Sequence, residues 1–166
     1  MKYLKLLVLT CVSMLLGSCC WSCPDDDGPV ANNQGNYQAV TMTRQQLEAS
    51  VEVTTPQPMV KSGKIYVKDN LLFVSDVNKG FHIYAYNDAG TPNEIAFLKV
   101  PGATDLAVRG TTLYINQATD LVTMVYANNT VTVVKRNANV FPQKQAPDWS
   151  WASLQENEII IDWIPL

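Results

Sequence analysis

The chain of 166 residues has the length of one domain, or of two at most. It is 47% hydrophobic and only 16% charged, which excludes a disordered chain over most of its length, because such chains are poor in apolar residues. A net charge of −3 argues against a nucleic-acid partner, since phosphate binding normally requires a basic face.

The N-terminus has the pattern of an export signal. Two lysines precede an uncharged, mostly apolar run over residues 6–17, which is short for a membrane span and typical of a signal peptide. The sequence LGSC at residues 16–19 resembles a bacterial lipobox, in which the cysteine is lipidated and becomes the new N-terminus. We therefore predict a lipoprotein signal peptide over residues 1–18 and a membrane anchor at Cys19.

A flexible tether is predicted over residues 19–40, because Pro24–Tyr37 is rich in Asp, Asn, Gly and Pro. No cysteine follows Cys23, so the body has no disulfide framework despite its oxidising destination. The acidic run Asp25–Asp27 resembles the surface-export signal of Bacteroidota lipoproteins. Two locations stay open, an outer-membrane lipoprotein exposed on the cell surface and one that faces the periplasm.

A short helix is predicted next, because Thr43 and Gln46 have the spacing of a capping box. Pro56 and Pro58 exclude a long continuation of this helix. Residues 41–59 are therefore expected to form a short helix followed by an extended lead-in to the body.

The body, residues 60–166, is predicted to be all-β. Short runs rich in Val, Ile and Tyr alternate with polar turns, and the hairpin around Leu72 recurs 41 residues later around Leu113. A period near 40 with four strands per unit is typical of β-propeller blades. We expect two antiparallel four-stranded meanders, over residues 63–102 and 103–141. Their strands are predicted at 65–67, 71–74, 81–86, 95–100, 106–108, 113–115, 121–126 and 131–134.

Two segments of the body, Lys64–Gly102 and Asp105–Val122, resemble the LVIVD-type repeats of uncharacterised Bacteroidota lipoproteins. The resemblance covers about residues 37–141 and implies a propeller-like fold. That family has no established catalytic activity, so the resemblance assigns no functional residue.

A terminal strand is predicted at residues 158–164, after a loop with two prolines. Closed propellers have roughly 4–8 blades, so two units and one strand do not close a ring. We expect an open two-blade stack, half of an oligomer or a part of a longer protein. The apolar terminal strand leaves an open edge, which favours self-association through edge strands.

The candidate ligand-binding residues are Trp149, Trp151, Trp163 and His82. The three tryptophans gather near the C-terminus and are expected either to cover the end of the sheets or to bind a sugar or a protein. His82 is the single histidine and is expected to be structural, since no catalytic constellation surrounds it in the sequence.

Acidic residues at strand ends, Asp76, Asp105 and Asp120, are expected to serve turns. No calcium-loop pattern is present in the sequence, and His82 is far from the Cys20–Cys23 pair, so neither a metal nor a cofactor is expected.

The sequence predicts a membrane-anchored, non-enzymatic lipoprotein that serves as an interaction or scaffold module. The alternative is a glycan-binding surface lipoprotein that uses the C-terminal tryptophans. A third hypothesis is a hydrolase that acts at a propeller axis completed by oligomerisation. This hypothesis requires His82 and several Asp residues to converge in one pocket.

Overall fold

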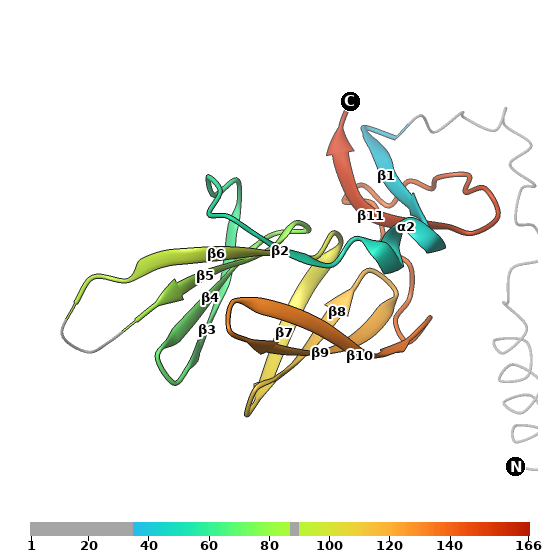
Figure 1. Cartoon of the computed structure of the whole chain (residues 1–166). Helices are drawn as coiled ribbons and strands as arrows, with labels where there is room; N and C mark the ends of the chain where they lie inside the picture. The colour runs from blue at the N-terminus through green and yellow to red at the C-terminus, as the bar shows by residue number, and fades with distance from the viewer. Residues whose placement is uncertain (1–34, 87–89) are drawn as a thin grey trace, which may run out of the picture. The chain divides into compact units, whose positions relative to one another are not determined.

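The computed structural model describes residues 35–86 and 90–166 (Figure 1). The predicted signal peptide, Cys19 and most of the tether lie outside these residues. The described chain forms three antiparallel sheets and one short helix, α2. Within these residues no helix has the length and hydropathy needed to cross a bilayer.

The first meander consists of β3 to β6, and a short strand, β2, extends it to five strands. The strand order is β2-β6-β5-β4-β3. Strands β3 to β6 each pair with their neighbours along the chain, whereas β2 pairs with β6, the last strand of the meander. The bounds are β2 (Glu52–Thr54), β3 (Ser62–Lys68), β4 (Leu71–Asp76), β5 (Gly80–Ala85) and β6 (Asn93–Lys99).

The second meander consists of β7 to β10 in the order β10-β9-β8-β7. Its last hairpin closes through Asn128 and Asn129, both with positive φ, a conformation that Asn tolerates and that matches the twist of the flanking strands. The bounds are β7 (Ala103–Arg109), β8 (Thr112–Gln117), β9 (Asp120–Ala127) and β10 (Thr130–Asn137).

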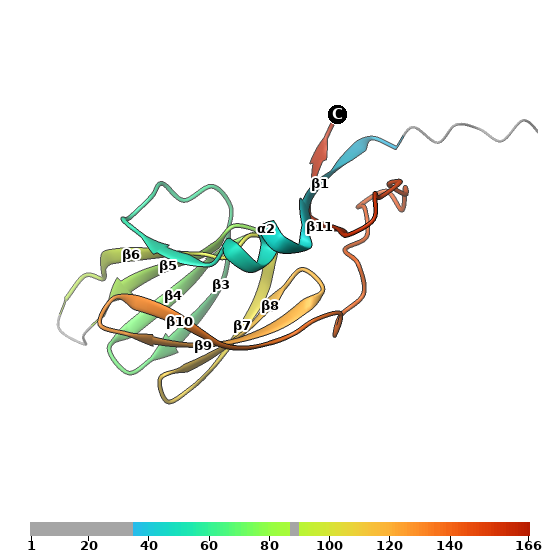
Figure 2. The same cartoon turned by 45° about the vertical axis from the view of Figure 1, so that its right-hand side comes forward.

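The two meanders pack face to face, with β3 in contact with β7 and β2 in contact with β10 (Figures 1 and 2). The large core between them is formed by the inward side chains of both sheets, and burial of this apolar surface is the main stabilising term. Its buried members are Phe73, Phe81, Ile83, Ala96, Leu98, Val100, Ala103, Leu106, Leu113, Ile115, Val122, Met124 and Tyr126.

A separate two-stranded ribbon joins the ends of the described chain, β1 (Tyr37–Thr43) with β11 (Glu158–Pro165). The helix α2 (Arg44–Ala49) follows β1 directly and begins with the predicted capping box. Thr43 Oγ1 accepts from the Gln46 amide at 3.2 Å, and the Gln46 side chain accepts from the Thr43 amide at 2.9 Å. Leu47 of α2 is fully buried in a second, smaller cluster with Ile159 and Ile161 of β11.

The predicted fold class is therefore confirmed, an all-β chain of two antiparallel meanders with a short N-terminal helix and a final strand. One detail of the sequence interpretation is wrong: residues 37–40, assigned to the tether, lie in β1, which pairs with the final strand. The cause is a pairing between residues more than 110 positions apart, which no local pattern predicts.

Candidate ligand-binding site

Two of the predicted tryptophans meet at one cavity. Trp151 and Trp163 both line a cavity of about 420 Å³ between the loop that precedes β11 and β11 itself. The other lining residues are Pro142, Gln143, Lys144, Gln145, Ser150, Ala152, Leu154 and Ile160. Trp149 does not line this cavity, although its side chain is 71% exposed.

The two rings are held differently. Trp163 is half-buried in β11, and its indole N–H donates to the Lys144 carbonyl at 3.0 Å, which fixes the ring orientation. Trp151 is 88% exposed, the most exposed large apolar side chain of the described residues. An apolar ring that stays in water is an available contact surface.

Asp148 holds the loop that carries Trp151. Its carboxylate accepts from the Asn36 amide at 2.7 Å and from the Ser150 amide and hydroxyl at 3.1 and 2.6 Å. These hydrogen bonds, the Ser150 hydroxyl first, lower the pKa of Asp148 below its ordinary value. Between these residues, Trp149 has a φ of +64°, which is unusual for a bulky side chain and indicates a sharply turned backbone.

Amide side chains contribute to the polar part of the cavity, whereas the Lys144 ammonium donates to Asn78 Oδ1. Gln143 Oε1 accepts from the Ile160 amide at 3.2 Å, which anchors that side chain, while Gln145 is exposed. Burial lowers the pKa of Lys144, and nearby Asp162 opposes this effect. Sequence reasoning missed these residues because a polar loop carries no periodic signal that separates site residues from solvated ones.

His82 of β5 lies between two carboxylates. It is fully buried, with Nδ1 2.6 Å from Glu94 Oε1 and Nε2 3.5 Å from Asp76 Oδ2. Its ring also contacts Phe97, with the centroids 4.8 Å apart. His82 lines neither the tryptophan cavity nor the cavity described below.

The three strand-end aspartates do more than serve turns, which corrects the sequence interpretation. Asp76 accepts from the amides of Val60 and Lys61 at 3.0 and 2.9 Å, and so fastens the lead-in to the first meander. Asp105 accepts from Lys64 Nζ at 2.7 Å and from the Tyr66 hydroxyl at 2.5 Å, which joins β7 to β3. Burial and this bond raise the pKa of Tyr66 to about 12.

Asp120 is fully buried and forms ion pairs with Arg44 at 2.5 Å and Arg136 at 2.9 Å. Burial alone would raise its pKa, but these two bonds and those from the Asn139 amide and Thr119 lower it below the ordinary value. Asp76, Asp105 and Asp120 thus belong to three separate clusters, and only Asp76 lies beside His82.

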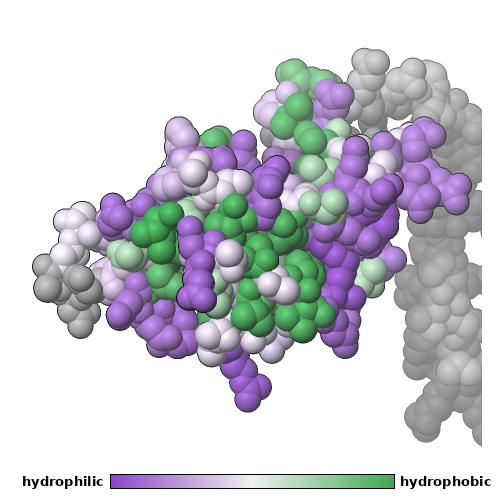
Figure 3. All heavy atoms as spheres, viewed as in Figure 1, coloured by the Kyte–Doolittle hydropathy of each residue, from purple (hydrophilic) through white to green (hydrophobic). Residues whose placement is uncertain are grey.

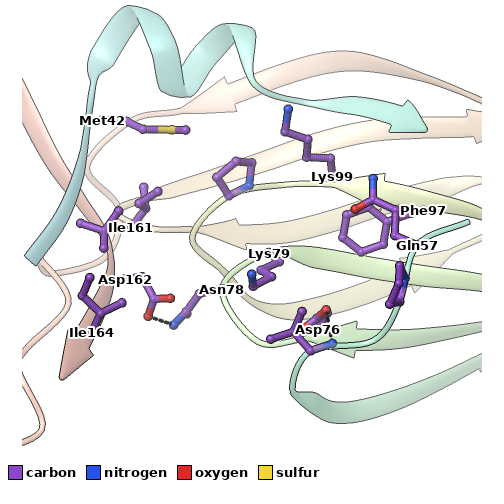
Figure 4. Close-up of a pocket in the computed structure, with 14 residues that line it drawn as sticks. Met42, Gln57, Asp76, Asn78, Lys79, Phe97, Lys99, Ile161, Asp162 and Ile164 are labelled. Carbon is purple, nitrogen blue, oxygen red and sulfur yellow. Dashed lines mark hydrogen bonds between the residues drawn. The ribbon is translucent and has the colours of Figure 1, made fainter. Parts of the chain in front are cut away.

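A second cavity of about 460 Å³ lies between the ribbon, the lead-in and β6. Figure 4 shows Met42, Ile161 and Ile164 on one side and Phe97 and Lys99 on the other. Its two carboxylates are already engaged, Asp76 with the lead-in amides and Asp162 with the Asn78 amide group. This cavity therefore offers mainly apolar surface.

No group of three or more His, Cys, Asp or Glu side chains suited to a metal ion occurs within residues 35–86 and 90–166.

No family model matches the chain, and neither the curated proteins nor the solved structures include a similar one. The resemblance to LVIVD repeats stays a prediction from the sequence. The site geometry is therefore the basis for a functional assignment.

Proposed function

We propose that this protein is a membrane-tethered, non-enzymatic lipoprotein that binds a glycan in the cavity between Trp151 and Trp163. The observation that carries the proposal is the meeting of these two rings at one concave surface, beside the amides of Gln143 and Gln145. Sugar rings present apolar C–H faces that stack on flat aromatic rings, and hydroxyl groups that amides can bind as donors and acceptors.

The way the loop is held supports binding over simple coverage of the sheet end. Asp148 accepts three hydrogen bonds within this loop and from Asn36, so Trp151 is presented on an ordered backbone. A side chain presented in this way loses less entropy on binding than one on a mobile loop. A ring that served only to cover the sheets would be buried, whereas Trp151 is 88% exposed.

The proposal includes the anchor and the place of action. The predicted lipid at Cys19 and the tether would keep the body at the outer membrane, exposed on the cell surface, with a periplasm-facing location as the alternative. The proposed kinship with LVIVD-type lipoproteins adds no catalytic residue. A binding role also agrees with His82, whose buried ring lies between Glu94 and Asp76 and away from the tryptophan cavity.

The test is a titration of the mature chain from residue 19, with Cys19→Ser to omit the lipid, against a panel of soluble polysaccharides. Tryptophan fluorescence and calorimetry report binding. We expect Trp151→Ala to weaken affinity by about 10-fold or more, the loss expected when an aromatic anchor is truncated. Trp149→Ala is the matched control, because Trp149 is 71% exposed two residues away and lies outside the cavity.

Two results would contradict the proposal. One is the absence of saturable binding to every polysaccharide tested. The other is an equal loss of affinity in the Trp151→Ala and Trp149→Ala variants, which would indicate a general aromatic effect.

A further inference from the structure

The pairing registers of the two meanders allow their positions to be matched. In the first meander, Leu72 pairs with Tyr84 and Val74 pairs with His82. In the second, Leu113 pairs with Met124 and Ile115 pairs with Val122. The same matching places Ile65 with Leu106 and Val67 with Val108 on the first strands. Each pair occupies the same place and the same face in its own meander.

The matched face is buried in one meander and open in the other. In the second meander it packs on the first, and Leu106, Leu113 and Ile115 are at most 4% exposed. In the first meander it points away from the core. There Ile65 and Val67 are each 64% exposed, and Leu72 and Val74 are half-buried.

Part of this outer face is already covered. The lead-in crosses near β5 and β6, where Asp76 holds the Val60 and Lys61 amides and where His82 and Phe97 are buried. The open part is the surface of β3 and β4, with Ile65, Val67, Leu72 and Val74, which we call the β3–β4 face.

The opposite end of the stack is different. The inner face of the first meander carries Phe73, Ile83 and Ala96 in one cross-strand row. The matched row on the outer face of the second meander is Tyr114, Thr123 and Lys135. This row of the second meander is thus polar or charged apart from the Tyr114 ring, whereas the β3–β4 face of the first meander is apolar.

We propose that a second copy of this chain packs on the β3–β4 face, with the first meanders of the two copies face to face about a two-fold axis. The internal stack shows that a sheet face covers the matched positions of the second meander. Head-to-tail packing in the register of the internal stack would instead set this face on the outer face of β7 and β8. That face carries Arg109 and Asn116, and burying these polar groups against apolar side chains costs free energy. Two-fold packing places the apolar face of one copy on the same face of the other.

This proposal does not depend on the tryptophan cavity, because Trp151 and Trp163 lie on the loop before β11 and on β11, not on β3 or β4. Failure of one proposal therefore leaves the other standing. The face also differs from the predicted edge pairing, since the contact would be made by side chains and not by strand backbones.

The test is sedimentation equilibrium of the chain from residue 19, with Cys19→Ser and a reductant present, over a wide concentration range. We expect a monomer–dimer equilibrium. Ile65→Glu should raise the dimer dissociation constant at least about 10-fold, because it buries an unpaired charge at the interface. Val134→Glu is the matched control, since Val134 is 63% exposed but lies in β10, and it should change the constant less than about two-fold.

Circular dichroism would confirm that both variants fold, which the exposure of both positions makes the expected result. A wild-type chain that stays monomeric at the highest concentration would overturn the proposal. So would a dimer that survives Ile65→Glu, which would indicate pairing by strand edges, and an assembly that grows without limit, which would indicate head-to-tail stacking.

Discussion

The two meanders differ at the corner between their second and third strands. The second strand ends with Asp76 in the first meander and with Gln117 at the matched position in the second. Asp76 accepts from the Val60 and Lys61 amides, whereas Gln117 donates to the Ser50 hydroxyl at 3.1 Å. Both corners thus fasten the chain that precedes β3.

The third strand begins with Gly80 in one meander and Asp120 in the other, again at matched positions. Gly80 has a φ of +147° and leaves room for the neighbouring backbone. Asp120 instead brings in the guanidinium groups of Arg44 and Arg136. The repeat therefore preserves the place at which the N-terminal segment is held, but not the chemistry that holds it.

The largest effect is expected for Gly80→Ala. An added Cβ would lie 2.1 Å from the Leu98 carbonyl oxygen and 2.9 Å from the Val100 nitrogen, so the backbone of β6 would have to move. We expect a loss of more than about 3 kcal/mol in the free energy of unfolding, measured with urea.

Gly110→Ala is the control for that experiment. Gly110 also has positive φ, at +58°, but no described heavy atom lies within 4 Å of its added Cβ. Only the left-handed strain remains, about 1 kcal/mol. Equal losses in the two variants would contradict the close approach of β6 to Gly80.

Asp120→Asn should cost about 3 kcal/mol at pH 7, because it removes the anion from two guanidinium groups at a buried position. The folded pKa of Asp120 lies below the ordinary 3.8. Its contribution is therefore complete above about pH 4 and is lost as the pH falls through the folded pKa. The gap between wild type and variant should shrink in acid.

The control is Asp105→Asn, which breaks a pair with Lys64 whose side chains are 52% and 65% exposed. We expect it to cost no more than about 1 kcal/mol. Urea unfolding at pH 7 and at about pH 3 measures both effects. A pH-independent gap for Asp120→Asn would show that the ion pairs do not supply its stabilisation.

His82→Val gives the first meander the residue that the second has at the matched position, Val122. We expect a loss of about 2 kcal/mol, because the Glu94 carboxylate loses its 2.6 Å partner in a poorly hydrated place. Glu94→Gln, which keeps an acceptor for the ring, should cost less. If His82→Val is as stable as wild type in urea, the imidazole contributes specificity and not stability.

The smallest effect is expected for Thr43→Ala, which removes the N-cap of α2 just before Arg44. The loss should be about 1 kcal/mol by urea unfolding, the ordinary contribution of such a cap. Thr43→Ser retains the hydroxyl and should remain close to wild type. An equal loss in both variants would point to packing of the Thr43 methyl group instead of capping.

Several features could be predicted because their causes are local. Thr43 and Gln46 are three residues apart, so their capping box is visible in the sequence and is observed. The last hairpin is local in the same way, because its turn at Asn128 and Asn129 lies between the strands predicted at residues 121–126 and 131–134. The cavity could be predicted only in part, because the gathering of tryptophans is visible while the lining by Gln143 and Gln145 is not.

The exposure of apolar side chains at the surface also depends on tertiary context. Figure 3 shows apolar side chains gathered over β10 and β2, where Val133 and Val134 are 40% and 63% exposed. By sequence alone these valines resemble Val122 and Val125 in the adjacent strand, of which Val122 is fully buried. Alternation assigns a residue to a face, but the neighbouring sheet decides which face is covered.

The β class, the two four-stranded units, the turns and the helix cap could be predicted from the sequence, because each follows from contacts between residues a few positions apart. The pairing of β1 with β11 and the ion pair of Asp120 with Arg44 became visible only in the folded chain. These contacts join residues far apart in the chain. They form only once the stacked meanders have set where each loop and strand end must lie.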